Sequence, residues 1–142
     1  MKNQMRLEFD SISENEAFAR VTVAAFVTRA NPTLEEVADI KTAVSEAVTN
    51  AIIHGYEGEV HTVILTARLE GRDLEIEVVD QGVDIPDVAK AMEPMYTTRP
   101  ELDRSGMGFL FMEAFMDEVQ VFSRPGEGTL VRMKKQLGKQ TE

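Results

Sequence analysis

Glu46 and Asn50 are two side chains that could act together on one reacting group. They lie four positions apart in a segment predicted to be helical, so they share one helix face, and His54 continues the stripe. A carboxylate can serve as a general base, and an amide oxygen can bind a hard metal ion. The same spacing also suits a solvated helix face, because polar pairs are common on helix surfaces.

Asp80 follows apolar residues that alternate along a predicted strand, namely Leu74, Ile76 and Val78. Because strand side chains alternate between two faces, the Asp80 carboxylate is expected to point to the buried face. A buried carboxylate is costly without a partner, so a ligand contact is one interpretation. The other is a strand-end Asp that bonds to the backbone of the turn it forms with Gln81 and Gly82.

Two glycine-containing motifs could bring the backbone close to a ligand. Residues 105–108, Ser-Gly-Met-Gly, precede a predicted helix, whose N-terminal amides favour phosphate, and Arg104 adds a cation. Taken alone, this motif is also compatible with a flexible helix start. Gly128 and Thr129 begin the last predicted strand, and taken alone they indicate only a hairpin turn.

Periodicity predicts the elements that must position these residues. Alternating apolar residues predict a first strand and two hairpins, at residues 5–9, 62–69 with 74–79, and 119–123 with 129–134. Capping boxes at Ser13 and Thr33 predict helices that run to about Arg29 and His54. A third helix is predicted at 107–115. The irregular segment 80–105 is typical of a lid or a binding loop.

The order of these elements predicts a single domain over residues 1–142. Paired strands and grouped helices favour an α+β two-layer sandwich, in which a mixed or antiparallel sheet carries the helices on one face. The polar tail, residues 135–142, is expected to be frayed. The first helix is expected to bury an apolar face that includes Phe18, Val21, Ala25 and Phe26.

Composition argues against several classes of protein. The net charge of −10 disfavours direct binding to nucleic acid, which needs a basic surface. The absence of cysteine excludes disulfides and thiolate metal sites. No apolar run approaches the about 18 residues that span a bilayer, and the N-terminus lacks a signal-peptide pattern. We therefore expect a cytoplasmic protein without a membrane segment.

Taken in order, the four motifs resemble those of the GHKL ATPases. Residues 46–51 resemble the N box of that family, residues 80–83 and 105–108 its two glycine boxes, and residues 128–129 its closing Gly-Thr. Segments 13–21, 45–56 and 96–109 are also similar to the anti-sigma kinase branch, most of all to its sporulation members. The resemblance spans nearly the whole chain and implies the GHKL, or Bergerat, sandwich.

The resemblance implies an ATP-dependent serine kinase that also inhibits a sigma factor. Glu46 would be the general base, Asn50 would hold Mg²⁺, and Arg104 would contact the phosphates during transfer. Asp80 would accept the adenine amino group, and Thr129 would support Asp80 or a bridging water at the adenine. The residues implied in ATP binding are Asn50, Asp80, Gly82, Thr97, Thr98, Ser105, Gly106, Met107, Gly108, Phe109 and Thr129.

The resemblance also implies protein partners. Arg20 on the first helix would be an exposed contact for a sigma factor and for an anti-anti-sigma protein in turn. That protein would be phosphorylated on a serine and inactivated. By analogy alone we expect a homodimer formed through the sheet edge and the helix region. Without the resemblance, Arg20 would be taken as a solvated helix residue.

Two positions depart from the family pattern. The second glycine of the first glycine box is Asp84 here, and position 99 is Arg where Lys is usual. Asp tolerates a left-handed backbone less well than Gly, and its charge opposes a polyphosphate. We therefore hypothesise weaker nucleotide affinity or a stiffer lid. An unchanged ATP dissociation constant in Asp84→Gly would contradict this hypothesis.

Three alternatives remain at this point. The chain could be an anti-sigma kinase of the stress-response branch, which only similarity separates from the sporulation branch. It could be a nucleotide-gated binding module without kinase activity, although a pure binder does not need the Glu46 carboxylate. It could also be a detached histidine-kinase catalytic domain, but no spare segment offers a suitable phosphoacceptor histidine beside His54 and His61.

Overall fold

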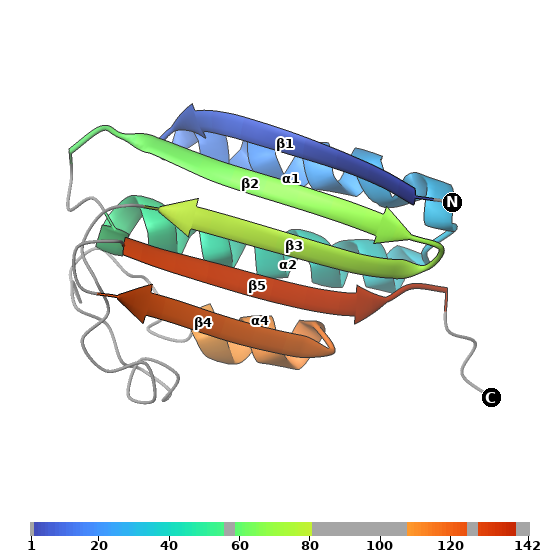
Figure 1. The fold of residues 1–142 in the computed structure, drawn as a ribbon. Coiled ribbons are helices and arrows are strands. Elements are labelled where there is room, and N and C mark those ends of the chain that lie inside the picture. Colours follow the sequence, from blue (N-terminus) through green and yellow to red (C-terminus); the bar gives the residue numbers. More distant parts are fainter. Residues whose placement is uncertain (1, 56–58, 81–107, 125–127, 139–142) are drawn as a thin grey trace.

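The computed structural model describes residues 2–55, 59–80, 108–124 and 128–138 (Figure 1). In chain order, the elements are β1 (Lys2–Asp10), α1 (Glu14–Val27), η1 (Thr28–Ala30), α2 (Leu34–Asn50), η2 (Ala51–Gly55), β2 (Thr62–Glu70), β3 (Asp73–Asp80), α4 (Gly108–Phe115), β4 (Glu118–Arg124) and β5 (Gly128–Gln136). No helix among the described residues is long and apolar enough to cross a membrane. Apart from Asp80, the irregular segment predicted at 80–105 lies outside the described residues.

The five strands form one sheet in the order β1-β2-β3-β5-β4. Each neighbouring pair is antiparallel, so the described sheet is antiparallel rather than mixed. Helices α1, α2 and α4 lie together on one face, and the other face carries no helix among the described elements (Figure 1). The predicted α+β two-layer sandwich is therefore confirmed.

Alternation along β2 and β3 directs one side of the sheet into the core. The inward side chains are buried as predicted, namely Val63, Leu65, Ala67, Leu69, Leu74, Ile76 and Val78. The turn between the two strands contains Gly71 at φ 62°, a left-handed conformation that glycine adopts without a Cβ penalty. The same alternation makes Asp80, the last residue of β3, point inward.

The predicted apolar face of α1 was wrong. The residues that α1 buries are Ala19, Val23 and Val27, whereas Phe18 and Val21 are 53% and 57% exposed. Ala25 is exposed too, and Phe26 packs only partly against the core. Ala19, Val23 and Val27 lie at intervals of four and form one stripe on the helix that packs against α2, whereas Phe18, Val21 and Ala25 lie off that stripe.

Only one of the two capping boxes forms. The Glu36 amide donates to the Thr33 hydroxyl at 3.0 Å, and the Thr33 amide donates to the Glu36 carboxylate at 2.8 Å. Ser13 instead has helical backbone angles and makes no side-chain cap. The Glu16 carboxylate, which would complete the first box, accepts a hydrogen bond from Ser45 on α2. A tertiary contact has thus replaced the local one.

The C-terminal segment is ordered further than expected. β5 continues to Gln136, the Leu137 side chain is fully buried, and the Leu137 amide donates to the Arg72 carbonyl at 2.7 Å. The Gly138 amide lies 3.1 Å from both carboxylate oxygens of Glu36. Residues 135–138 therefore belong to the folded domain and correct the expected frayed tail, whereas 139–142 lie outside the described residues.

Glu36→Gln is expected to destabilise the fold by about 1 kcal/mol at neutral pH, the usual size of a capping contribution. Burial acts to raise the pKa of Glu36, but donors from Thr33 and Gly138 and the charge of Lys135 hold that pKa below its ordinary value. A lowered folded-state pKa stabilises the fold above the unfolded-state pKa, and this is lost as pH falls through the folded-state pKa.

Denaturant unfolding between pH 3 and pH 7 measures this effect, with exposed Glu35→Gln as the matched control. The free-energy difference between the native chain and Glu36→Gln should be complete above about pH 5 and shrink below about pH 4. A difference that stays constant over this range would show that the Glu36 charge does not hold the C-terminal segment.

Candidate functional site

Helix α2 positions Glu46 and Asn50 beside the core. The side chains that it buries are Ile40, Ala43, Val44, Ala47 and Val48. Glu46 and Asn50 lie next to this stripe and are half-buried, so the polar stripe is not a fully solvated helix face. Because they are half-buried, both groups remain accessible to a ligand, and bulk water competes less with that ligand for them.

The end of α2 reaches the sheet through a change in helix type. The predicted helix to His54 is continuous only to Asn50, and residues Ala51–Gly55 form a π-helical turn, η2. This turn packs against β3 and β5. Figure 1 shows the end of α2 at the same end of the sheet where β3 finishes and β5 begins. Such turns often occur at functional sites, and this one directly follows Asn50 and contacts both strands.

The Glu46 carboxylate lies against the first residue of α4. A Cβ atom placed on Gly108 would be 3.2 Å from Glu46 Oε2, so glycine leaves room for this approach. The amides at a helix N-terminus carry partial positive charge, which favours an anion there. The structure therefore brings the predicted base and the second glycine motif together. Sequence reasoning gave each a role but did not predict their contact.

Gly108→Ala is expected to lower the rate of catalysis about three- to tenfold, because the added Cβ forces the Glu46 carboxylate to move by a few tenths of an ångström. The maximal rate at saturating nucleotide measures the effect. Glu113→Ala, an exposed change on the same helix, is the control. A rate equal to that of the control would show that the Glu46 position is not critical.

Asp80 and Thr129 meet on neighbouring strands. They are direct partners in the β3–β5 register, and they are only 3% and 4% exposed. Their side chains share the inward face, and Asp80 is one of three buried polar residues that the structure describes. The pair therefore places a carboxylate and a hydroxyl on one buried face, and such polar groups can orient a polar ligand.

Ser123 is a neighbour of this pair that sequence reasoning missed. It is the register partner of Thr129 on β4, and the Thr129 hydroxyl donates to the Ser123 hydroxyl at 3.4 Å. The Ser123 hydroxyl in turn donates to the Gly128 carbonyl at 3.3 Å. Its inward position follows from the alternation with Val119 and Val121, a signal that could have identified it.

Several predicted site residues cannot be placed. Gly82, Thr97, Thr98, Arg104, Ser105, Gly106 and Met107 lie outside the described residues, as do Asp84 and Arg99. Phe109 is described in the first turn of α4, and its side chain is buried in the core. Any contact of Phe109 with a phosphate would therefore come from its backbone amide.

Arg20 on α1 is less exposed than expected. Its side chain is 38% exposed, and its Nη1 atom is 3.7 Å from Glu16 Oε1. The Arg20 Nε atom is buried and has no hydrogen-bond partner among the described residues. The same Glu16 oxygen accepts from Ser45, the residue before Glu46. Only part of the guanidinium is therefore available to a partner.

Comparison with known families matches this geometry. A family model described as a histidine kinase-like ATPase domain matches residues 11–135. The RsbU and RsbW domains of Rv1364c from Mycobacterium tuberculosis share the fold with a TM-score of 0.70 at 19% identity. This match covers 98% of the present chain and 34% of that longer chain.

Curated relatives match at much higher identity. The anti-sigma F factor of Clostridium acetobutylicum is 57% identical over 137 residues, 96% of each chain. That of Oceanobacillus iheyensis is 56% identical over 140 residues, 98% of this chain and 96% of the relative. The chain therefore belongs to the histidine kinase-like ATPase family and, within it, to the anti-sigma F factors. The predicted GHKL resemblance is confirmed, and the domain is an ATP-binding domain.

Proposed function

We propose that this protein binds and inhibits a sigma factor and uses Mg²⁺-ATP to phosphorylate a serine of an anti-anti-sigma protein. The observation that carries the proposal is that two pairs of residues lie toward one end of the sandwich, each pair brought together by the fold. Glu46 lies against the start of α4, and Asp80 faces Thr129. One pair supplies a base at a helix N-terminus, and the other supplies buried polar groups for a nucleobase.

Glu46 is suited to act on the attacking serine hydroxyl. In the proposed step, the serine proton passes to the Glu46 carboxylate, and the serine oxygen forms a bond to the γ-phosphorus. The bond between that phosphorus and the β–γ bridging oxygen breaks, and ADP leaves. Phosphoryl transfer depends mainly on positioning and charge neutralisation. The half-buried Glu46 would position the serine hydroxyl, and the α4 amides would offset phosphate charge.

The described residues also fit the nucleotide and its metal. Asn50 offers an oxygen ligand, and Mg²⁺ commonly takes few protein ligands together with substrate phosphates and water. The bound Mg²⁺ would neutralise phosphate charge. Asp80 would accept the adenine amino group, with Thr129 beside it. The roles proposed for Gly82, Arg104 and the other residues outside the described ranges rest on the family pattern alone.

The partner surface is proposed on α1. The exposed part of Arg20 lies on the same helix as the exposed Phe18 and Val21, so charge and apolar area are offered together. We propose that sigma factor and anti-anti-sigma protein use Arg20 in turn and that no DNA contact is involved, in keeping with the net charge of −10. This activity belongs in the cytoplasm. Titration of each partner with Arg20→Ala tests the role of the arginine.

A homodimer is proposed through β1 and α1. β1 ends the sheet order and pairs only with β2 among the described strands, and such an edge is a template for pairing. Helix α1 contacts β1 and therefore borders this edge. Sedimentation of the native chain at micromolar concentration measures its mass, and a monomer at all concentrations would contradict this part of the proposal.

The whole proposal is tested by incubating the native chain with [γ-³²P]ATP, Mg²⁺ and a purified anti-anti-sigma protein. Label on a serine of that protein, lost when EDTA removes the metal, is the expected result. Binding of ATP without any transfer would contradict the kinase and favour a nucleotide-gated binder. Label on histidine would contradict the serine specificity.

A further inference from the structure

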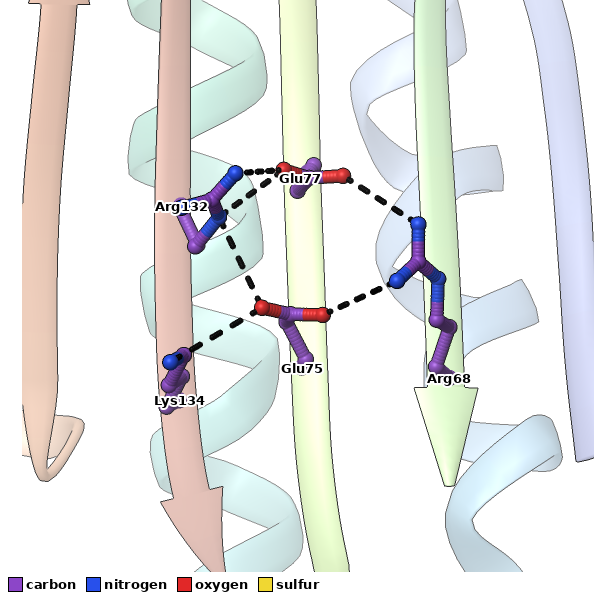
Figure 2. Close-up of polar contacts among 5 residues, drawn as sticks. All are labelled: Arg68, Glu75, Glu77, Arg132 and Lys134. Carbon is purple, nitrogen blue, oxygen red and sulfur yellow. Dashed lines mark hydrogen bonds and ion pairs between the residues drawn. The ribbon is translucent and has the colours of Figure 1, made fainter. Parts of the chain in front are cut away.

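The face of the sheet opposite the helices carries an ion network across three strands (Figure 2). Its members come from β2, β3 and β5, namely Arg68, Glu75, Glu77, Arg132 and Lys134. Figure 2 shows both glutamates on the central strand, with cations on either side. The outward parity of β3 places these carboxylates on the side of the strand away from Asp80.

The contact of Arg132 with Glu77 is the shortest in this network. Arg132 Nε donates to Glu77 Oε2 at 2.9 Å, and Arg132 Nη2 is 2.8 Å from the same oxygen. The Glu77 side chain is only 14% exposed. The Arg132 guanidinium also lies 5.3 Å from the centre of the Phe122 ring on β4. Arg132 therefore connects β3, β5 and β4 through one planar group.

The Glu77–Arg132 pair and the Asp80–Thr129 pair belong to the same strand ladder. Glu77 and Arg132 are register partners, and so are Asp80 and Thr129, three positions further along. Three residues of strand span about 10 Å. Asp80 ends β3 and Thr129 is the second residue of β5. The site pair is therefore the last pair of the described β3–β5 ladder and has neighbouring pairs on one side only.

We propose that Arg132, through Glu77, is a positioning residue for nucleotide recognition. Its ion pair resists sliding and twisting of β3 against β5, and this keeps the Asp80 carboxylate and the Thr129 hydroxyl aligned toward one ligand. The inference rests on the proposed role of Asp80 and Thr129 at the nucleobase. The inference gives Arg132, whose side chain points away from the site, a part in the selectivity for adenine.

Arg68 provides a matched comparison on the same face. It contacts the same two glutamates at 3.4 Å and 3.9 Å, but from β2, on which we place no site residue. It is also 58% exposed, against 32% for Arg132. Loss of Arg68 removes charge from the network without loosening β3 from β5. A general effect of network charge would therefore appear in both variants, and a positioning effect only in Arg132 variants.

The test measures dissociation constants for ATP and for inosine triphosphate, which lacks the amino group, with the rate of transfer at saturating ATP and the melting temperature. Arg132→Ala is expected to weaken ATP binding about two- to fivefold, the size that a partly exposed ion pair carries, and to reduce the preference for ATP over inosine triphosphate. The saturated rate should be unchanged. Arg132→Lys should fall between Arg132→Ala and the native chain, and Arg68→Ala should match the native preference.

A lower melting temperature with an unchanged preference in Arg132→Ala would overturn the inference and make the ion pair a strand stabiliser only. If Arg132→Ala does not fold, Arg132→Lys decides on the same preference. Asp80→Ala is measured alongside. If Asp80→Ala keeps the native preference for ATP, the proposed role of Asp80 is wrong. If Asp80→Ala loses that preference while both Arg132 variants keep it, only the present inference is wrong.

Discussion

Glu46→Gln is expected to slow phosphoryl transfer by about 10²- to 10⁴-fold, the range that a positioned general base contributes. Glutamine has nearly the same size and shape, but it cannot accept the serine proton. Because Glu46 is half-buried beside core residues that the change leaves intact, the fold should survive. The loss should therefore appear in the maximal rate and not in the fraction of folded protein.

ATP affinity separates a lost base from a lost binding site. The Glu46 carboxylate lies against Gly108 at the start of α4, and we propose no contact of Glu46 with the nucleobase, so the dissociation constant of ATP should remain within about twofold of the native value. Removal of a negative charge from the α4 N-terminus should cost only about 0.3–1 kcal/mol of stability. Rapid-quench measurement of a single turnover and titration with a fluorescent ATP analogue give both quantities.

The control is Glu35→Gln. Glu35 is an exposed carboxylate in the first turn of α2, the helix that also carries Glu46. The substitution changes the net charge by the same amount and leaves the site untouched, so its rate should equal that of the native chain. Transfer by Glu46→Gln at the control rate would remove Glu46 from the mechanism. The α4 N-terminus and the residues outside the described ranges would then have to supply catalysis by positioning alone.

Strand parity allowed much of the site to be predicted from the sequence. Alternation of Leu74, Ile76 and Val78 predicted that Asp80 points inward, and its 3% exposure confirms this. The period of two is a local property of the chain, so it needs no knowledge of the partner strand. Parity could not predict the partner of Asp80, because β3 pairs with β5, a strand that lies far from it in the chain. Spacing alone could not reveal that Thr129 faces Asp80.

Helix faces were harder to predict than strand faces. On α1, Phe18 and Val21 were expected inside, but the buried stripe runs through Ala19 and Val23. Side-chain size is a poor guide where two helices approach closely, because the contact selects residues that let the backbones come near. The failed capping box at Ser13 has a related cause, since Glu16 is used by Ser45 on another helix.

The approach of Glu46 to Gly108 shows the limit of motif reasoning. Two motifs far apart in the chain each suggested a role, and no pattern within either indicated their distance. The packing of α4 on α2 creates the contact, and that packing depends on buried residues such as Phe109 and Met112. The geometry of the proposed site is thus set by the hydrophobic core at least as much as by the polar residues themselves.

Asp80→Ala is expected to weaken ATP binding about 10- to 150-fold, which corresponds to about 1.5–3 kcal/mol for a hydrogen bond to a charged group. Asp80 is buried beside Thr129, so its removal takes away an acceptor that bulk water does not replace directly. Asp80→Asn keeps the shape and one acceptor oxygen but loses the charge, so its loss should be smaller. Isothermal titration of both variants with ATP gives the dissociation constants.

The matched control is Asp73→Asn, an exposed aspartate at the opposite end of the same strand, which should bind ATP as the native chain does. A double-mutant cycle then assigns the contact, with inosine triphosphate removing the amino group from the ligand. If Asp80 accepts that amino group, removal of either partner costs most of the energy, and removal of both costs little more. Additive losses would mean that the two groups do not touch and that Asp80 serves the fold of the strand end rather than recognition of adenine.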